Sequence, residues 1–176
     1  MASAALLKKN SPPKQRLDAF MQSWLTAYYT ANQAVVGATG DFITAPEISQ
    51  MFGELIGLWL VEQYQYLKEP SQFHLAELGP GRGTLMADIL RVLPKKMRDA
   101  LKLHLVDINP HLKKAQASTL QEFSPNWHGS VQDLVRHLST CPAPLLLVAN
   151  EYFDALPIRQ FKKSSDGTWQ EAFVHQ

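Results

Sequence analysis

The chain's clearest candidate for ligand chemistry combines three alternating glycines with two carboxylates. Glu77, Gly79, Gly81 and Gly83 alternate with other residues between a predicted strand and a predicted helix. Glycines let the backbone turn tightly and approach a ligand closely, and the first turn of a helix presents unpaired N–H groups. Asp107 ends the next predicted strand, roughly 20 residues beyond the loop, where a carboxylate can accept both hydroxyls of a ribose. Together these features predict a nucleoside-binding site at the carboxyl ends of parallel strands.

The glycine spacing separates two classes of cofactor. A dinucleotide fingerprint requires Gly-x-Gly-x-x-Gly, but here the third glycine comes one residue early and Thr84 takes its place. A nicotinamide-dependent oxidoreductase is therefore disfavoured. The order Glu-x-Gly-x-Gly-x-Gly resembles motif I of the S-adenosylmethionine methyltransferases, which implies that Glu77 orients the methionine ammonium through water. The alternative is an ordinary tight turn, with Asp107 capping a helix together with Asn109.

Candidates for contacting an adenine lie near the end of the third predicted strand. They are Trp127, His128, Ser130 and Asp133. A core position for Trp127 and a surface position for His128 remain open as alternatives.

Hydrophobic spacing and turn residues predict the elements that position these groups. Helices are expected over 17–28, 46–67, 84–93, 110–121 and 131–138, and strands over 73–78, 101–108, 126–128 and 145–149. The last strand is apolar on both faces, as buried parallel strands are. A hairpin is expected between 158–161 and 168–174.

The alternation of strands and helices predicts an α/β fold with a parallel sheet. We expect a Rossmann-like methyltransferase domain over 46–176, incomplete in this chain, preceded by a lead-in, helix and loop over 1–45. The lead-in over 1–16 is expected to be flexible. The helix over 46–67 is predicted to begin with a capping box made by Thr44 and Glu47. Its apolar face is expected to pack in the core, and that face comprises Ile48, Met51, Phe52, Leu55, Ile56 and Trp59.

Composition excludes several classes of function. The net charge of +1 gives no general field for holding nucleic acid, and no stretch approaches the ~20 apolar residues of a membrane helix. The single cysteine, Cys141, excludes an intrachain disulfide and a cysteine-based zinc site, and it fits a reducing compartment. We expect no metal. The expected location is the bacterial cytoplasm, with the mitochondrial matrix as the alternative, because the first 17 residues are basic but lack a clear transit-peptide repeat.

Three segments together resemble the MidA-type methyltransferases, a bacterial and mitochondrial family that includes the complex I assembly methyltransferase. They are residues 40–57, the glycine loop over 77–83, and residues 150–157, and the resemblance covers roughly 17–176. It implies S-adenosylmethionine as cofactor and methylation of a protein arginine, in the mitochondrial member on a respiratory complex I subunit.

The segment over 150–157 follows the fourth predicted strand, beside the expected methyl group. Asn150 is suited to hydrogen-bond the acceptor or cofactor, and the carboxylates of Glu151 and Asp154 are suited to orient a guanidinium. A solvated turn is the alternative for both carboxylates.

Three further residues are candidates for closing the pocket or facing the acceptor. They are Asp41, Thr44 and Glu54.

The chain is about half the length of such family members and provides only part of the expected sheet. Two interpretations remain open. The chain is either a truncated or split product that still folds around the glycine loop, or it needs a homo-oligomer or a partner chain to complete the sheet, since an unfinished edge favours pairing. The rival to an enzyme is a non-catalytic cofactor-binding or assembly protein with the same fold.

Overall fold

The structure, a computed structural model, describes residues 14–31 and 44–175. The chain forms two compact units. The larger comprises Tyr29–Asp154, and the smaller combines Met1–Tyr28 with Ala155–Gln176.

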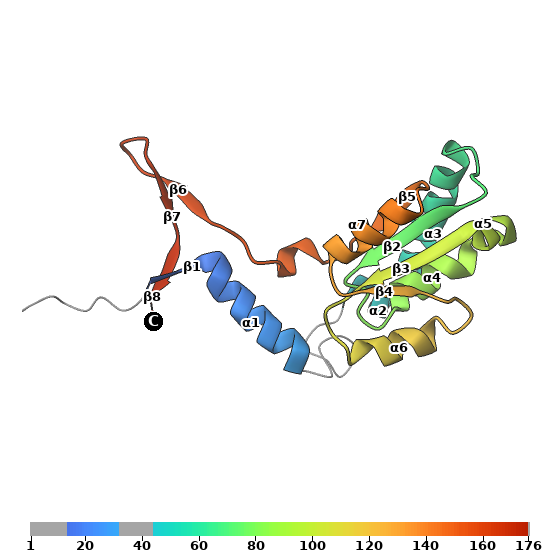
Figure 1. Cartoon of the computed structure of the whole chain (residues 1–176), viewed down its shortest axis with the longest axis horizontal. Helices are drawn as coiled ribbons and strands as arrows, with labels where there is room; N and C mark the ends of the chain where they lie inside the picture. Colours follow the sequence, from blue (N-terminus) through green and yellow to red (C-terminus); the bar gives the residue numbers. More distant parts are fainter. Residues whose placement is uncertain (1–13, 32–43, 176) are drawn as a thin grey trace, which may run out of the picture. The chain divides into compact units, whose positions relative to one another are not determined.

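The larger unit is built on a four-stranded parallel sheet (Figure 1). Its order is β4 (Asn126–His128), β3 (Leu101–Val106), β2 (Phe73–Leu78) and β5 (Leu145–Val148). The register pairs Glu77 with Leu105 on one side and with Val148 on the other. Because all four strands run the same way, their carboxyl ends meet at one edge of the sheet. The expected α/β fold with a parallel sheet is confirmed.

Helices cover both faces of this sheet. Residues from α3 (Gln50–Tyr66), α4 (Thr84–Val92) and α5 (Lys95–Ala100) share the main core with Phe73, Leu75, Leu103 and Leu105 of the central strands. On the opposite face, α7 (Val131–Thr140) packs through Leu134 against Ala76, Leu78 and Val106. The alternation of side chains along each strand divides these two sets. The helix α6 (Leu112–Thr119) follows β3 and leads to β4.

The predicted long helix is interrupted. Helix α2 (Ala45–Ile48) ends at Ser49, whose extended backbone (φ −146°) separates it from α3. The predicted capping box is also wrong, because the Thr44 side chain makes no capping bond. The carboxylate of Glu47 instead accepts a hydrogen bond from the Thr84 hydroxyl at 2.7 Å, which ties α2 to the first turn of α4.

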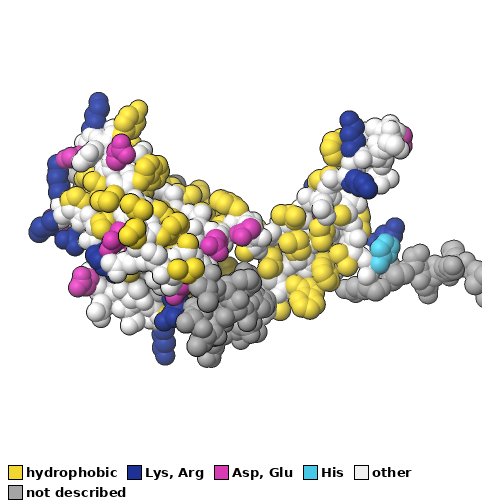
Figure 2. Space-filling view, turned by 180° about the vertical axis from the view of Figure 1, so that it is seen from behind, with side chains coloured by type: hydrophobic (Ala, Val, Ile, Leu, Met, Phe, Trp, Pro, Cys, Tyr) yellow, Lys and Arg dark blue, Asp and Glu magenta, His cyan; other side chains and the backbone are white. Residues whose placement is uncertain are grey.

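The face of α3 that packs in the core differs from the predicted one. Gly53 and Gly57 face α4 so closely that a Cβ on Gly57 would lie 2.4 Å from Cγ2 of Val92. Leu60 and Tyr64 continue this buried face. Phe52 and Ile56 contact the core as predicted. The close approach turns the opposite side of α3 outward, so Met51, Leu55 and Trp59 of the predicted core face are exposed, as is Ile48 of α2. Figure 2 shows hydrophobic side chains gathered on the surface of this unit.

The strand β5 is not buried on both faces as predicted. Leu145 and Leu147 are 41% and 47% exposed, whereas Leu146 and Val148 pack toward the main core. The difference follows from topology, since β5 lies at the edge of the described sheet and α7 packs against the central strands. Short α5 was also not predicted.

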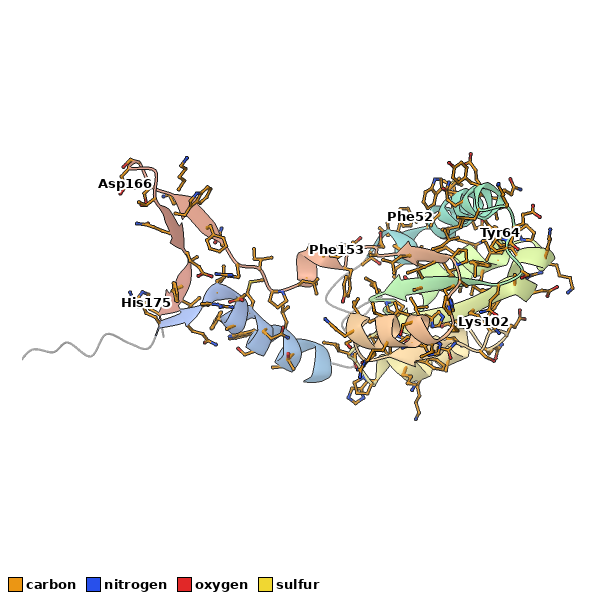
Figure 3. The ribbon with its side chains drawn as sticks, turned by 45° about the horizontal axis from the view of Figure 1, so that its top comes forward. Phe52, Tyr64, Lys102, Phe153, Asp166 and His175 are labelled. Carbon is orange, nitrogen blue, oxygen red and sulfur yellow. The ribbon has the colours of Figure 1, made fainter. Side chains whose placement is uncertain are left out.

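The smaller unit contains most of α1 (Leu17–Ala31), up to Tyr28, and two small antiparallel sheets. In one, β1 (Lys14–Arg16) pairs with β8 (Phe173–His175), so residues 14–16 of the predicted flexible lead-in form a strand. In the other, β6 (Phe161–Lys163) and β7 (Trp169–Glu171) form the expected hairpin, with Asp166 in its turn (Figure 3). None of the described helices is long and apolar enough to cross a bilayer.

Candidate functional site

The glycine loop connects β2 to α4 and needs glycine for its backbone conformation. Gly79, Gly81 and Gly83 all have positive φ, at 65°, 54° and 86°, a region that residues with a Cβ rarely adopt. A Cβ on Gly79 would also lie 2.8 Å from the ring of Tyr152. The N–H of Gly79 donates to Val106 O at 2.9 Å, so the loop begins level with the end of β3. This geometry brings the backbone and the start of α4 to the carboxyl edge of the sheet.

Glu77 is a buried carboxylate directly before this loop. Its side chain is 2% exposed, and Oε2 has no hydrogen-bond partner among the described residues. Burial, and secondly the charge of Asp107, raises the pKa of Glu77 to about 8. A buried acceptor without a partner is costly, and a cationic group beside it would favour the ionised form. The site is therefore suited to an ammonium group.

Asp107 follows β3 and faces the same side of the sheet as Glu77, as strand alternation requires. Its Oδ1 accepts from Asn109 N at 2.8 Å and its Oδ2 from Gln116 Nε2 at 2.8 Å. Burial raises the pKa of Asp107, and these two hydrogen bonds oppose the rise. The Asn109 bond closes a local turn between β3 and α6, and the N-cap residue of α6 is His111, which has no side-chain capping bond, so the alternative in which Asp107 caps a helix is not supported. An ionised carboxylate has further lone pairs, so it can hold this turn and still accept hydrogen bonds from a ligand.

Gln116 was not among the predicted site residues. It is completely buried on α6, and its Nε2 donates to Gly81 O at 2.9 Å as well as to Asp107. Its Oε1 accepts from Trp127 Nε1 at 2.9 Å. The sequence does contain a pattern that indicates this residue. Leu112, Gln116 and Leu120 lie four residues apart on one face of a helix, and a polar residue on a buried face requires hydrogen-bond partners.

The two predicted adenine contacts on β4 face opposite sides of the sheet. Trp127 packs toward the main core and bonds Gln116, with the Lys113 amine 5.0 Å from its ring centroid. His128 points to the α7 side, where its Nε2 lies 3.0 Å from His104 Nδ1. Successive residues of a strand alternate between faces, which is why the structure separates this pair. Only Trp127 shares the side of Glu77 and Asp107.

His128 ends a buried row of histidines across three strands. His74 Nδ1 lies 2.9 Å from His104 Nε2, and His74 Nε2 lies 2.9 Å from Cys141 O. The carbonyl can only accept, so neutral rings make His74 donate to it, His104 donate to His74, and His128 donate to His104. Burial lowers the pKa of His104 to about 4. The row is linear, and within the described residues no cluster of His, Cys, Asp and Glu could hold a metal ion.

Ser130 and Asp133 begin helix α7. The Ser130 hydroxyl oxygen accepts from Asp133 N at 3.1 Å and its O–H donates to Asp133 Oδ2 at 2.8 Å. Asp133 also pairs with Arg136. Helix capping thus accounts for both of these adenine candidates.

The N-terminal candidates are dispersed. Asp41 lies outside the described residues. Thr44 precedes α2, whose Glu47 bonds the first turn of α4. Glu54 accepts from Gln50 Nε2 and, at 3.3 Å, from Arg91 Nη1 near the end of α4. These bonds direct Glu54 toward the last turn of α4, whereas the glycine loop lies before its first turn.

The candidate catalytic segment follows β5. Since Glu77 pairs with Val148, Asn150 lies close to level with Gly79, and the Tyr152 ring contacts Gly79. Glu151 has a positive φ of 48°, unusual for a residue with a Cβ, and its side chain is exposed. Asp154 is also exposed, in a short 3-10 helix with Phe153 (Figure 3). The segment therefore places two exposed carboxylates after the strand that neighbours the glycine loop.

Comparison with known proteins agrees with this geometry. Residues 55–176 match the sequence model of a family described as "Putative S-adenosyl-L-methionine-dependent methyltransferase". The mitochondrial protein arginine methyltransferase NDUFAF7 homolog of Drosophila melanogaster is 41% identical over 88% of this chain, and human NDUFAF7 is 36% identical over 83%. The matches cover 40% and 37% of those two proteins, so this chain spans about 40% of the length of its curated relatives.

A solved structure supports the fold independently. A protein from Burkholderia thailandensis, crystallised with S-adenosyl-homocysteine, superposes with a TM-score of 0.59 at 20% identity, over 93% of this chain and 46% of that one. At this identity the likeness shows a shared fold. The family match and the NDUFAF7 relatives confirm the resemblance found in the sequence: the chain belongs to this S-adenosyl-L-methionine-dependent methyltransferase family.

Proposed function

We propose that this chain binds S-adenosylmethionine at the glycine loop and acts in the methylation of a protein arginine. The observation that carries the proposal is the buried Glu77 carboxylate, whose Oε2 lacks a partner within the described part of the chain, beside three glycines with positive φ. Glu77 would hold the methionine ammonium, and Asp107 would accept the ribose hydroxyls. The names of the curated relatives support an arginine acceptor.

The residues after β5 supply what the acceptor needs. S-adenosylmethionine provides a methyl group on a sulfonium sulfur, and transfer to a guanidinium nitrogen forms an N–C bond, breaks the S–C bond, and releases a proton and S-adenosylhomocysteine. Glu151 and Asp154 would bind the planar guanidinium and orient its attacking nitrogen. Asn150 would hydrogen-bond the acceptor or the cofactor. These groups act mainly through positioning, since the displacement itself needs little further assistance.

The names of the relatives suggest the substrate and the cellular location of this chain. We expect the substrate to be a protein and, more specifically, a subunit of respiratory complex I. The relatives are mitochondrial proteins, which favours the mitochondrial matrix over the bacterial cytoplasm. β5 is an edge strand of the described sheet, so its free backbone edge is where a homo-oligomer or a partner chain would complete the sheet. Its exposed side chains, Leu145 and Leu147, lie beside that edge.

Calorimetry tests cofactor binding directly. The chain should bind S-adenosylmethionine and S-adenosylhomocysteine but not NAD. Gly81→Val and Asp107→Ala should each abolish binding while the protein stays folded, whereas Asp99→Ala, at an exposed position of α5, should bind normally. Normal binding by the first two folded variants would disprove the site assignment.

Methyl incorporation into arginine-containing peptides separates the enzyme from a non-catalytic binding protein. If the segment after β5 is catalytic, Glu151→Ala should lose turnover and keep its affinity for S-adenosylhomocysteine. Cofactor binding without any methyl transfer would favour the non-catalytic assembly protein.

A further inference from the structure

We infer that Gln116 is the positioning residue of the adenosyl half of the pocket, acting through Asp107, the glycine loop and Trp127. The inference rests on the proposed function, because it assigns a role within the same site. It adds a residue from α6, an element from which no ligand contact was expected.

Both amide donors and the carbonyl oxygen of Gln116 make hydrogen bonds to residues of the proposed pocket. A side-chain amide has two N–H donors and one carbonyl acceptor group. In this structure the donors go to Gly81 O and Asp107 Oδ2, and the carbonyl accepts from Trp127 Nε1, each at 2.8 or 2.9 Å. These partners belong to three segments: the loop after β2, the end of β3, and β4. One buried amide thus links the three segments that would surround a nucleoside.

The contact with Asp107 fixes the carboxylate in one orientation. Asn109 N donates to one oxygen and Gln116 Nε2 to the other, so the carboxylate plane cannot rotate without losing a hydrogen bond. Both donors are neutral. The carboxylate therefore keeps its charge and its remaining lone pairs for the hydroxyls of a ribose.

The contact with Gly81 acts on the loop itself. Gly81 has a positive φ of 54°, and the donated hydrogen bond holds its carbonyl toward α6. The adjoining Trp127 ring is held by its own N–H bond, and the Lys113 amine lies over it. Because these groups are ordered before the ligand binds, the entropic cost of ordering them on binding is reduced.

Only an amide can make this set of bonds. A carboxylate of the same shape accepts but cannot donate, so Gln116→Glu removes both donors and adds a charge beside Asp107 and Glu77. Burial and these neighbouring carboxylates would raise the pKa of the introduced group. Once protonated, it regains one O–H donor. Of the described titratable groups, Asp107 bonds Gln116 directly, Glu77 interacts with Asp107, and the Lys113 amine lies over the ring of Trp127, the third partner of Gln116.

The test measures S-adenosylhomocysteine and adenosine affinities by calorimetry at about pH 8 and about pH 6. At the higher pH, Gln116→Glu should bind both ligands about tenfold to a hundredfold more weakly than wild type, as expected for lost hydrogen bonds to a charged group. The ratio of its Kd to the wild-type Kd should fall as the pH falls. Gln116→Met should be weaker by a ratio independent of pH. Gln121→Glu makes the same chemical change at an exposed position and should bind as wild type does.

The outcomes separate this inference from the proposed function. If wild type binds neither ligand, the proposed function fails. If wild type binds and the Gln116 variants bind equally well, the inference alone is overturned, and so it is if the Gln116→Glu ratio is independent of pH. Should these variants fail to fold, wild-type NMR decides: the Gln116 side-chain amide protons should shift and exchange more slowly with ligand bound, and unchanged signals overturn the inference.

Discussion

Replacing Glu77 with glutamine should stabilise the folded protein at alkaline pH while weakening ligand binding. The pKa of Glu77 is raised from 4.5 to about 8, mainly by burial. An acid whose pKa is raised on folding holds its proton more tightly in the folded state, so its contribution favours folding at low pH and is lost as the pH rises from 4.5 to 8. The introduced amide would carry no charge at any pH and would escape this cost.

The size of the effect follows from the shift. A difference of one pKa unit corresponds to roughly 1.4 kcal/mol, so a rise from 4.5 to about 8 costs roughly 5 kcal/mol at pH well above 8. Between about pH 6 and about pH 8.5 the same linkage predicts a loss of roughly 2–3 kcal/mol. That loss should be present in wild type and absent in Glu77→Gln.

Urea denaturation at these two pH values measures the effect. The difference in unfolding free energy between Glu77→Gln and wild type is the relevant quantity, because titrating groups that do not interact with Glu77 contribute equally to both proteins. Asp107 does interact with Glu77, and its coupling is part of the measured difference. Glu62→Gln, at an exposed position of α3, is the matched control and should change little. If the difference between Glu77→Gln and wild type does not grow with pH, then Glu77 is not held as an unpaired buried carboxylate.

Three further predictions concern the scaffold of the site. The lowered pKa of His104, about 4 against an ordinary 6.5, predicts that roughly 3 kcal/mol of stability is lost as the pH falls through this range, because the unfolded chain takes up the proton first. Denaturant titrations should show a flatter pH slope for His104→Gln, and an unchanged slope argues against the neutral row. Gly57→Ala should destabilise the fold by about 1–3 kcal/mol, because the added Cβ would lie 2.8 Å from Ile89 O and overpack the contact with α4. The change should appear as a lower thermal midpoint of unfolding. Gly129→Ala adds a Cβ where there is space and should be tolerated. Thr84→Val removes the hydrogen bond to Glu47 and should lower the free energy of unfolding in urea by about 1 kcal/mol. Thr119→Val makes the same change at an exposed position and should have little effect. Equal effects of the two substitutions would show that this hydrogen bond does not stabilise the fold.

Much of the site could be predicted because its parts are local in sequence. Turn chemistry required glycine at Gly79, Gly81 and Gly83, and all three have positive φ. Strand alternation and spacing predicted that Asp107 ends the strand beside the loop, which the register of β2 and β3 bears out. Both inferences needed only properties of one strand, one turn and one helix.

The remaining features depend on tertiary contacts that periodicity does not encode. The spacing of α3 offered two apolar faces, and the close contact of Gly53 and Gly57 with α4 decides which is buried. The strand over 126–128 was predicted, so alternation alone separates Trp127 from His128, but which of the two shares the side of Asp107 depends on the register of β4 on β3. The three partners of Gln116 come from segments distant in sequence. The carboxylate of Glu47 likewise bonds across the fold to Thr84 instead of to its own helix.

A crystal structure of this chain with S-adenosylhomocysteine would test the central claim most directly. We predict the ligand's amino group beside Oε2 of Glu77 and its ribose hydroxyls on the carboxylate of Asp107, with Gln116 still joining Gly81 to Asp107. A ligand bound elsewhere, or one that leaves both carboxylates untouched, would contradict the account.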